Sequence, residues 1–262
     1  MSTVPAASLV PSVATVDVSI VIPAYNEELR ITPTLEGMHR FLAAHPLRWE
    51  IVVVDDGSTD GTVALVERLA ARIPHLRVIA SKPNRGKGHA VRVGMLAARG
   101  KVRVMSDADG SMPPEELPKL LGRIASGEVE IAIGSRYVAG AAVAQKQPLY
   151  RRLWSRLCNQ VVQRALVPGV RDTQCGFKAF TDDAARDLFG RARIDGWAFD
   201  LEILALARRR AWAIAEVAVR WQDDERSRVS PLRDMWKVIK EAVTIRRNLR
   251  HGVYGELGPA AA

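Results

Sequence analysis

Two groups of aspartates follow apolar, β-branched segments, and they are the side chains best suited to chemistry in this sequence. One is Asp55-Asp56-Gly57-Ser58-Thr59-Asp60, and the other is Asp107-Ala108-Asp109-Gly110. Clustered carboxylates repel one another unless a cation or a polar ligand offsets their charge. Hard divalent ions such as Mg²⁺ or Mn²⁺ prefer oxygen ligands, and Mg²⁺ often binds one or two carboxylates together with substrate phosphates. Alternate residues of an extended segment point the same way, so Asp107 and Asp109 are candidate ligands of one ion.

A simpler explanation is that these acids close turns and cap helices. Asp60 precedes a predicted helix, and capping alone explains it equally well. An isolated Asp-x-Asp motif would also favour the turn explanation. Two acidic groups at the ends of alternate predicted strands favour a shared site instead.

The segment Asn84-Arg-Gly-Lys-Gly-His89 lies between the two acidic groups. It opens a predicted helix, where backbone N–H groups attract anions, and Arg85 and Lys87 add positive charge. The glycine spacing and the missing Lys-Ser/Thr ending exclude a P-loop. Taken alone, the segment is better explained as a solvated turn.

Apolar segments alternate with amphipathic segments in the first half. Strands are predicted at 16–23, 49–54, 76–80, 101–106 and 129–134, and helices at 26–45 (capped by Asn26), 62–72, 88–99 and 113–125. This alternation predicts an α/β fold with a mostly parallel sheet and helices on both faces. Ligands of such sheets bind beyond the carboxyl ends of the strands, which is where both acidic groups fall.

The second half is less regular. It is predicted to contain a mobile loop at 138–147, helices at 149–166, 197–208 and 235–249, and strands at 176–180 and 214–221. We expect one domain over residues 16–250. Residues 1–15 are expected to form a flexible leader and residues 251–262 a tail.

Charge is distributed unevenly along the 262 residues. The net charge is +9, residues 1–135 hold 15 basic and 15 acidic side chains, and the whole excess lies in residues 136–262. The second half is therefore expected to face an anionic partner. A hydrophobic content of 48% excludes general disorder.

The apolar N-terminal stretch, 1–16, is shorter than the roughly 20 residues that span a bilayer, and it lacks a basic start. Cys158 and Cys175 are too few for a disulfide framework or a four-ligand zinc site. The chain is expected to be cytoplasmic, and soluble or peripheral to a membrane.

Four motifs in order resemble the inverting family-2 glycosyltransferases of the GT-A fold. They are Val18-Ser-Ile-Val-Ile-Pro-Ala-Tyr-Asn-Glu27, Val54-Asp-Asp-Gly-Ser-Thr-Asp60, Asn84-Arg-Gly-Lys-Gly88 and Asp107-Ala-Asp109. Later segments are similar to dolichyl-phosphate (polyprenyl-phosphate) β-glucosyltransferases: Gly134-Ser-Arg136, Asp172-Thr-Gln-Cys-Gly-Phe-Lys178, Trp197-Ala-Phe-Asp-Leu-Glu202 and 217–221. The resemblance covers roughly residues 16–250, and it implies a nucleotide-sugar-binding half at 16–135 and an acceptor-binding half at 136–250 with a basic C-terminal helix.

The resemblance implies roles for individual residues, with Asp109, Asp200 and Arg136 as the catalytic candidates. The nucleotide sugar would be bound by Pro23, Ala24, Tyr25, Glu27, Asp55, Asp56, Lys87 and Asp107, and Mg²⁺ or Mn²⁺ by Asp107 and Asp109. The acceptor and the transferred sugar would be bound by Arg136, Gln174, Lys178, Trp197, Asp200, Glu202, Arg226 and Arg228. Arg226-Ser-Arg228 stands where relatives often have Gly-Ser-Lys, which keeps the positive charge but departs from the family's loop.

The implied reaction is transfer of a hexose, preferentially glucose from UDP-glucose, to a polyprenyl or dolichyl monophosphate. A metal would offset the charge that develops on the departing diphosphate. A phosphate acceptor has its second pKa near ~6, so it needs positioning and charge compensation more than a base. Arginine suits that task, which favours Arg136. Asp200 would serve as a base only for a hydroxyl acceptor, and sugar binding is its favoured role.

A basic segment near the C-terminus admits two explanations. Its apolar residues are Met235, Trp236, Ile239, Val243 and Ile245, and its basic residues are Lys237, Lys240, Arg246, Arg247 and Arg250. Such a helix fits the interface of an anionic membrane. Packing of the apolar strip on the protein core is slightly favoured over that explanation.

Three alternatives to glucose transfer remain at this stage. One is a polyprenyl-phosphate mannosyltransferase that uses GDP-mannose. Another is a nucleotide-binding module without catalysis, which the intact Asp107, Asp109 and Lys87 disfavour. Nucleic-acid binding ranks last, because the high pI is accompanied by no DNA- or RNA-binding signature.

Overall fold

A mixed seven-stranded sheet forms the centre of the molecule. The computed structural model describes residues 16–143, 166–222 and 231–256. The sheet comprises β1 (Val18–Ala24), β2 (Trp49–Asp56), β3 (Leu76–Ser81), β4 (Val102–Ser106), β5 (Ile131–Ser135), β7 (Phe177–Thr181) and β8 (Ile214–Ala218) in the order β3-β2-β1-β4-β7-β5-β8. β7 runs antiparallel to β4 and β5, whereas β3-β2-β1-β4 and β5-β8 pair in parallel. β6 (Ala142–Val143) and β9 (Arg220–Trp221) form a separate parallel pair.

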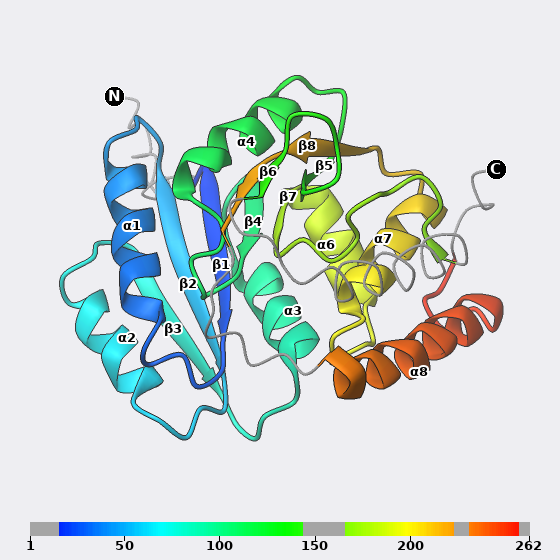
Figure 1. The fold of residues 1–262 in the computed structure, drawn as a ribbon, viewed down its shortest axis with the longest axis horizontal. Helices are drawn as coiled ribbons and strands as arrows, with labels where there is room; N and C mark the ends of the chain where they lie inside the picture. The colour runs from blue at the N-terminus through cyan, green and yellow to red at the C-terminus, as the bar shows by residue number, and fades with distance from the viewer. Residues whose placement is uncertain (1–15, 144–165, 223–230, 257–262) are drawn as a thin grey trace, which may run out of the picture.

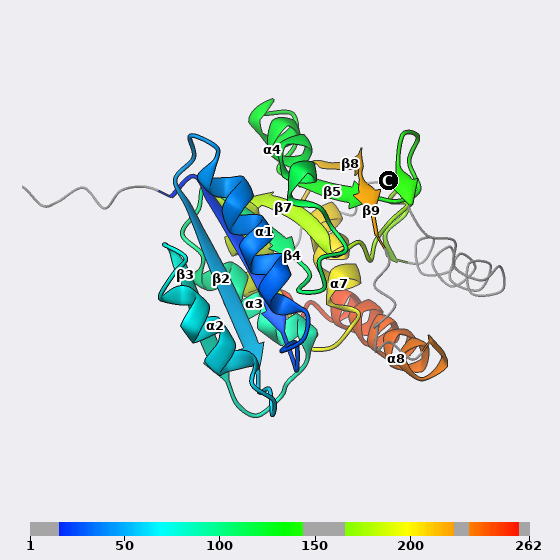
Figure 2. The same ribbon diagram turned by 60° about the vertical axis from the view of Figure 1, so that its left-hand side comes forward.

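Helices cover both faces of this sheet (Figures 1 and 2). They are α1 (Ile31–Ala43), α2 (Thr62–Ala70), α3 (Lys87–Ala97), α4 (Leu117–Ala125), α6 (Asp182–Arg191), α7 (Phe199–Arg209) and α8 (Pro231–Arg250), with the 3₁₀ turn η1 (Pro114–Glu116) before α4. α1 and α4 lie on one face, and α3, α6 and α7 lie on the other. α8 packs against α7 at the side of the molecule, and the predicted α/β architecture is confirmed.

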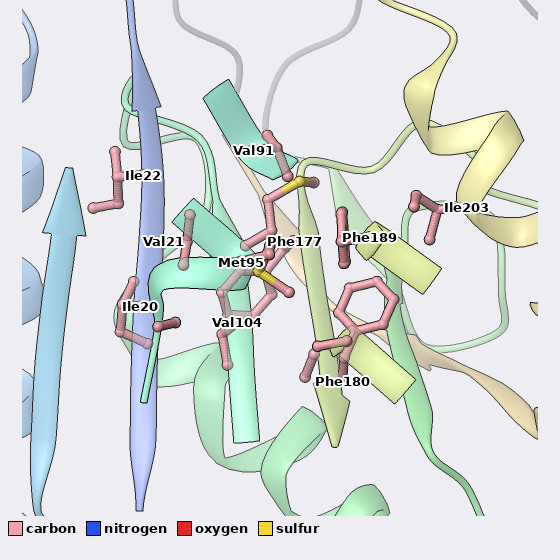
Figure 3. Close-up of a cluster of buried hydrophobic side chains, with 14 of the residues drawn as sticks. Ile20, Val21, Ile22, Val91, Met95, Val104, Phe177, Phe180, Phe189 and Ile203 are labelled. Carbon is pink, nitrogen blue, oxygen red and sulfur yellow. The ribbon is translucent and has the colours of Figure 1, made fainter. Parts of the chain in front are cut away.

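The central strands form because they are β-branched and bury both faces. Every residue of β1 is buried, as are Glu50–Asp56 of β2. This is the pattern of a parallel strand covered by helices on both sides. Figure 3 shows the resulting core, in which Val21 and Val104 meet Met95 of α3, and Phe180 packs edge-on against Phe189.

The topology brings distant motifs to one edge of the sheet. β1, β2, β3 and β4 are parallel, so the residues after Ala24, Asp56, Ser81 and Ser106 lie at the same edge. The antiparallel β7 begins there, because Phe177 pairs with Ser106. Residues 172–176, just before β7, therefore lie beside the Asp107–Asp109 segment.

Two local expectations need correction. Asn26 does not cap the first helix, which begins at Ile31; Asn26 instead has φ 56° and belongs to the loop after β1. The helix expected over 113–125 is divided into η1 and α4. The leader at 1–15, nearly all of the helix expected at 149–166 and part of the loop at 138–147 lie outside the described residues.

Gly94 permits close packing of α3 on the sheet. A Cβ atom there would lie 2.4 Å from Val21 Cγ1 and 2.8 Å from Val54 Cγ2. We therefore expect Gly94→Ala to lower the free energy of unfolding by about 1–3 kcal/mol in urea denaturation, the usual cost of overpacking. Gly122→Ala in α4 is the matched control, because nothing lies within 4 Å of its added Cβ. It should gain about 0.5–1 kcal/mol, and equal effects at the two glycines would contradict this account.

Candidate active site

The loops after β1 and β2 are joined by hydrogen bonds around Asn26. The Asn26 N–H donates to Ser58 Oγ at 2.8 Å, and the Thr59 N–H donates to Asn26 Oδ1 at 2.8 Å. The Glu27 N–H donates to Thr62 Oγ1 at 2.8 Å. The positive φ of Asn26 turns the chain after Ala24 and leaves Tyr25 about half exposed at the edge of the sheet. Pro23 and Ala24 themselves are buried at the end of β1.

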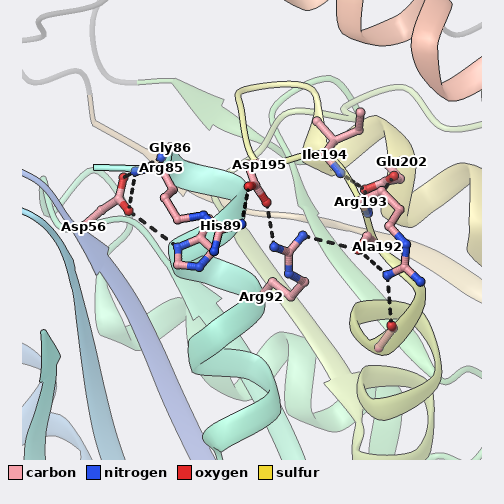
Figure 4. Close-up of polar contacts among 11 residues, drawn as sticks. Asp56, Arg85, Gly86, His89, Arg92, Ala192, Arg193, Ile194, Asp195 and Glu202 are labelled. Carbon is pink, nitrogen blue, oxygen red and sulfur yellow. Dashed lines mark hydrogen bonds and ion pairs between the residues drawn. The ribbon is translucent and has the colours of Figure 1, made fainter. Parts of the chain in front are cut away.

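Asp55 and Asp56 both stabilise turns at this edge, which agrees with the simpler explanation that these acids close turns. Asp55 Oδ2 accepts from the N–H groups of Gly57 and Ser58 at 3.1 and 3.0 Å. Asp56 accepts from the N–H groups of Arg85 and Gly86, which fixes the loop before α3 (Figure 4). Asp55 Oδ1 is buried and has no hydrogen-bond partner in the described part of the chain. An unsatisfied buried acceptor is costly, so this oxygen is suited to receive a donor from a ligand.

Lys87 and Asp107 form the central ion pair of the site. Lys87 Nζ lies 2.7 Å from Asp107 Oδ1, and 5.4 Å from the centre of the Trp197 ring. Burial lowers the pKa of Lys87, but the nearby carboxylates of Asp107, Asp200 and Asp109 outweigh it, so the pKa is raised and Lys87 stays charged. Residues of three sequence motifs thus meet at the Lys87 ammonium group.

Glycine at position 176 is required by the Asp107 side chain. A Cβ atom on Gly176 would lie 2.0 Å from Asp107 Oδ2, so any side chain there would displace the carboxylate. Gly176 was part of the motif at 172–178 but was not among the predicted site residues. The pairing of β4 with β7, which the sequence alone does not reveal, creates this contact.

Asp109 occupies an environment that disfavours its charge. Burial raises the pKa of Asp109, and the neighbouring Asp107 raises it further, while the Ser111 N–H donates to Asp109 Oδ1 at 2.9 Å and partly compensates. A divalent cation would relieve this repulsion, and the hard carboxylate oxygens suit Mg²⁺ or Mn²⁺. Residues 16–143, 166–222 and 231–256 contain no group of three or more metal-ligating side chains, so other ligands would have to come from substrate or water.

Asp200 and Lys178 form a buried ion pair next to this group. Lys178 Nζ donates to Asp200 Oδ1 at 2.6 Å and to the Cys175 carbonyl oxygen at 2.5 Å. Burial raises the pKa of Asp200, and the charges of Lys178 and Lys87 oppose that rise. Cys175 is also buried, which raises its pKa to about 12, so it is an inert thiol rather than a nucleophile.

Arg136 is held in a bidentate ion pair with Asp172. Its Nε and Nη2 donate to the two Asp172 oxygens at 2.8 and 2.9 Å, and its backbone N–H also donates to Asp172. The guanidinium group lies over the rings of Tyr137 and Trp221. Burial lowers its pKa, but the bonds to Asp172 raise it more strongly, so Arg136 remains a fixed positive charge. Gln174 is exposed on the adjoining loop.

Glu202 does not line this site. Its side chain is fully buried, where it accepts from the N–H groups of Arg193 and Ile194 and from the Tyr254 hydroxyl at 2.7 Å. Residues two apart on an α-helix point roughly 200° apart, so Asp200 faces Lys178 while Glu202 faces Tyr254. Glu202 thus stabilises the 192–195 loop instead of contacting the sugar. Arg226 and Arg228 lie outside the described residues.

The 192–198 loop carries the predicted Trp197, and it is held in place by Asp195, which was not predicted. Asp195 forms ion pairs with Arg85 at 3.0 Å and Arg92 at 2.6 Å, and its carbonyl oxygen accepts from the His89 N–H (Figure 4). These bonds join the start of α3 to the loop that carries Trp197. Asp195 occurs in no recognisable motif, so its role depends on a three-dimensional contact.

Comparison with known proteins identifies the family. Residues 19–189 match the model of the family described as "Glycosyl transferase family 2". This chain belongs to glycosyl transferase family 2. The family-2 assignment agrees with the arrangement of Lys87, Asp107 and Asp109 at the carboxyl edge of the sheet, and it confirms the family predicted from the motifs.

Relatives of this family-2 chain carry a more specific name. A dolichyl-phosphate beta-glucosyltransferase of Dictyostelium discoideum is 35% identical over 247 residues, which cover 90% of this chain and 76% of the relative. The Saccharomyces cerevisiae protein of the same name is 36% identical over 257 residues, with the same shares covered. Because they cover 90% of the chain, these similarities extend beyond residues 19–189, the range of the family match.

Solved structures confirm the GT-A fold of this glycosyl transferase family 2 member. Glucosyl-3-phosphoglycerate synthase from Mycobacterium tuberculosis, solved with Mn²⁺, UDP-glucose and phosphoglyceric acid, aligns with a TM-score of 0.66. The alignment covers 88% of this chain and 80% of the other at 21% identity. At that identity the likeness establishes the fold alone.

The raised pKa of Asp109 leads to a prediction about stability. A carboxyl group whose pKa is higher in the folded than in the unfolded chain stabilises the fold at low pH, and that contribution is lost as pH rises through the folded pKa. Asp109→Asn should therefore raise the melting temperature in EDTA at pH 7. It should change the melting temperature little at pH 3, which is below the ordinary pKa of an aspartate side chain. Asn keeps an acceptor for the Ser111 N–H. A lower melting temperature at pH 7 would contradict the assigned repulsion.

Proposed function

We propose that this enzyme transfers glucose from UDP-glucose to a polyprenyl or dolichyl monophosphate, with inversion at the anomeric carbon. The observation that carries the proposal is the convergence of Lys87, Asp107, Asp109 and Asp200 at the carboxyl edge of a family-2 domain. The names of relatives that match 90% of the chain support the glucosyl donor and the lipid-phosphate acceptor. The Mycobacterium tuberculosis enzyme solved with Mn²⁺ and UDP-glucose has the same fold, which supports the donor and the metal.

The donor would lie along the edge formed by the loops after β1, β2 and β4. Tyr25 and the unpartnered Asp55 Oδ1 would contact the nucleoside, and the Asp56-bound loop would present Lys87 to the diphosphate. Mg²⁺ or Mn²⁺ held by Asp107 and Asp109 would supply positive charge to the leaving diphosphate. Lys87 already carries a fixed charge beside Asp107, so it would stabilise the same developing negative charge.

The acceptor would approach from the second half of the chain. A phosphate monoester is mostly a dianion at neutral pH and needs no base to become nucleophilic. Asp200 is bound by Lys178, which favours a role in holding a sugar hydroxyl over proton removal. Arg136 has Nε and Nη2 engaged by Asp172, so its remaining Nη1 edge and its fixed charge would attract the lipid phosphate.

α8 would place the enzyme on an anionic membrane, at its cytoplasmic face. Trp236, Ile239 and Val243 are exposed along one face of α8, together with Lys240, Arg246 and Arg247, whereas Ile245 is buried in the core. Ile245 therefore fits packing of α8 on the protein core. The exposed apolar residues, which have basic neighbours, are typical of a helix at a membrane interface. No helix within 16–143, 166–222 or 231–256 has the length and apolar character needed to cross a bilayer.

Two other functions would use the same edge of the sheet. A mannosyltransferase using GDP-mannose would differ in the donor alone, and a non-catalytic module would bind nucleotide without turnover. A panel of radiolabelled UDP-glucose, UDP-galactose, UDP-N-acetylglucosamine and GDP-mannose with a short polyprenyl phosphate separates these functions. Label from UDP-glucose in the organic phase supports the proposal, and label from GDP-mannose alone contradicts it.

Removing the Asp109 carboxylate should abolish transfer while leaving the fold intact. We expect Asp109→Ala to lower turnover by at least about 100-fold, because charge stabilisation of a leaving group is commonly of that size. EDTA should abolish wild-type turnover, and Mn²⁺ should restore it in the wild type alone. Circular dichroism checks the fold. Near-normal turnover of the variant, or full wild-type activity in EDTA, would contradict the metal role.

Charge reversal on α8 should weaken membrane binding. The Arg246→Glu/Arg247→Glu variant should sediment less with phosphatidylserine vesicles at low salt, since each basic residue near such a surface contributes about 1 kcal/mol. Arg68→Glu/Arg72→Glu, on α2 and just after it, is the control, because both residues are exposed and the change in net charge is identical. An equal loss in the two double variants would indicate net charge, not α8, as the cause.

A further inference from the structure

Glu241 of α8 contacts the loop that carries Trp197. Its Oε2 accepts from the Ala198 N–H at 2.7 Å. A Cβ atom on Gly196 would lie 1.9 Å from Glu241 Oε1, so the absence of a side chain at 196 allows the carboxylate to reach the backbone. Glu241 was not among the predicted site residues, and nothing in the proposed reaction uses it.

This contact supplies a helix cap from another element. Ala198 is the N-cap residue of α7 and has no side chain that could satisfy the N-terminal N–H groups. A carboxylate at this end also interacts favourably with the positive end of the helix dipole. Glu241, 43 residues further along the chain, therefore binds the N–H group that the N3 glutamate binds in a capping box, the N–H of the N-cap residue itself.

The capped segment bears two residues of the site. Trp197, directly before the cap, lies over Lys87, and Asp200, at the start of α7, binds Lys178. Asp195 already fixes the other end of the loop to α3 through Arg85 and Arg92. The loop is therefore held from α3 on one side and from α8 on the other.

We propose that Glu241 is a positioning residue: by capping α7 from α8, it fixes Trp197 and Asp200 at the nucleotide-sugar site. The proposal rests on the proposed function for the identity of the donor. It makes donor binding depend on the placement of α8, the same helix whose opposite face carries Trp236 and Val243. Lipid contact and donor binding would thus be linked through one carboxylate.

Hydrogen exchange and nucleotide binding test this proposal together. Glu241→Ala should speed exchange of the Ala198 amide about tenfold and weaken binding of UDP with MnCl₂, measured by calorimetry without lipid, about fivefold to tenfold. Glu241→Gln keeps an acceptor and should restore most of both. Thr244→Ala, on the same helix, is the control because its hydroxyl bonds only within α8, to the Lys240 carbonyl oxygen. The proposal would be overturned if Glu241→Ala had the same Ala198 exchange rate, or the same affinity for UDP, as Thr244→Ala.

Gly196→Ala provides a second route that keeps Glu241 in place. The added Cβ should push the carboxylate from Ala198 and weaken UDP binding as Glu241→Ala does. In the double variant the loss should not exceed that of either single variant, because both act on one contact. Additive losses would overturn the proposal. Failure of the wild-type chain to bind UDP would instead contradict the proposed function and the donor part of this inference, while Ala198 exchange would still decide whether Glu241 caps α7.

Discussion

The site depends on the charge of Lys87, which lies among the carboxylates of Asp107, Asp109 and Asp200, the last of which is also paired with Lys178. Lys87 lies beside Asp107, and Asp109 and Asp200 are close enough to raise its pKa. Without Lys87, the three carboxylates would share a partly buried space in which each would disfavour ionisation of the others. With Lys87 in place, the site retains a net negative charge that a divalent ion can neutralise. Burial, together with the nearby Asp107 carboxylate, explains why Asp109 has a raised pKa although it is bound by the Ser111 N–H.

The sheet topology makes this balance possible. Asp107 follows β4, Lys87 begins α3, and Asp200 lies at the start of α7, so the charges come from three segments, of which the first and the last are more than 100 residues apart in the sequence. The antiparallel β7 is what joins them, because it places Gly176 against Asp107 and Lys178 against Asp200. The parallel strands alone bring Lys87 and Asp107 together at the carboxyl edge of the sheet. The antiparallel β7 adds Lys178, which forms the buried ion pair with Asp200 beside that edge.

Sequence reasoning reached the elements and the acidic motifs because both have local signals. β-branched runs predicted β1, β2 and β4 closely, and the glycine-flanked aspartates marked the strand ends. Roles that depend on distant partners could not be predicted from the sequence, because Asp195 and Glu241 belong to no motif. Asn26 has the residue type of a helix cap, and only its positive φ shows that it does not cap a helix. Asp200 and Glu202 belong to one motif, yet the turn of a helix sends them to different environments.

Glu202 and Glu241 show how one stretch of chain can be held without lining the site itself. Glu202 binds the N–H groups of residues 193 and 194, and Glu241 binds that of Ala198, so two carboxylates from α7 and α8 satisfy donors on both sides of Trp197. A loop stabilised only by its own residues would leave those N–H groups to water. Under the proposed function, fixing the loop from two helices would reduce the conformational freedom that Trp197 loses when a nucleotide sugar binds. The affinity of the site would then depend on packing at α8 as well as on the residues that face the ligand.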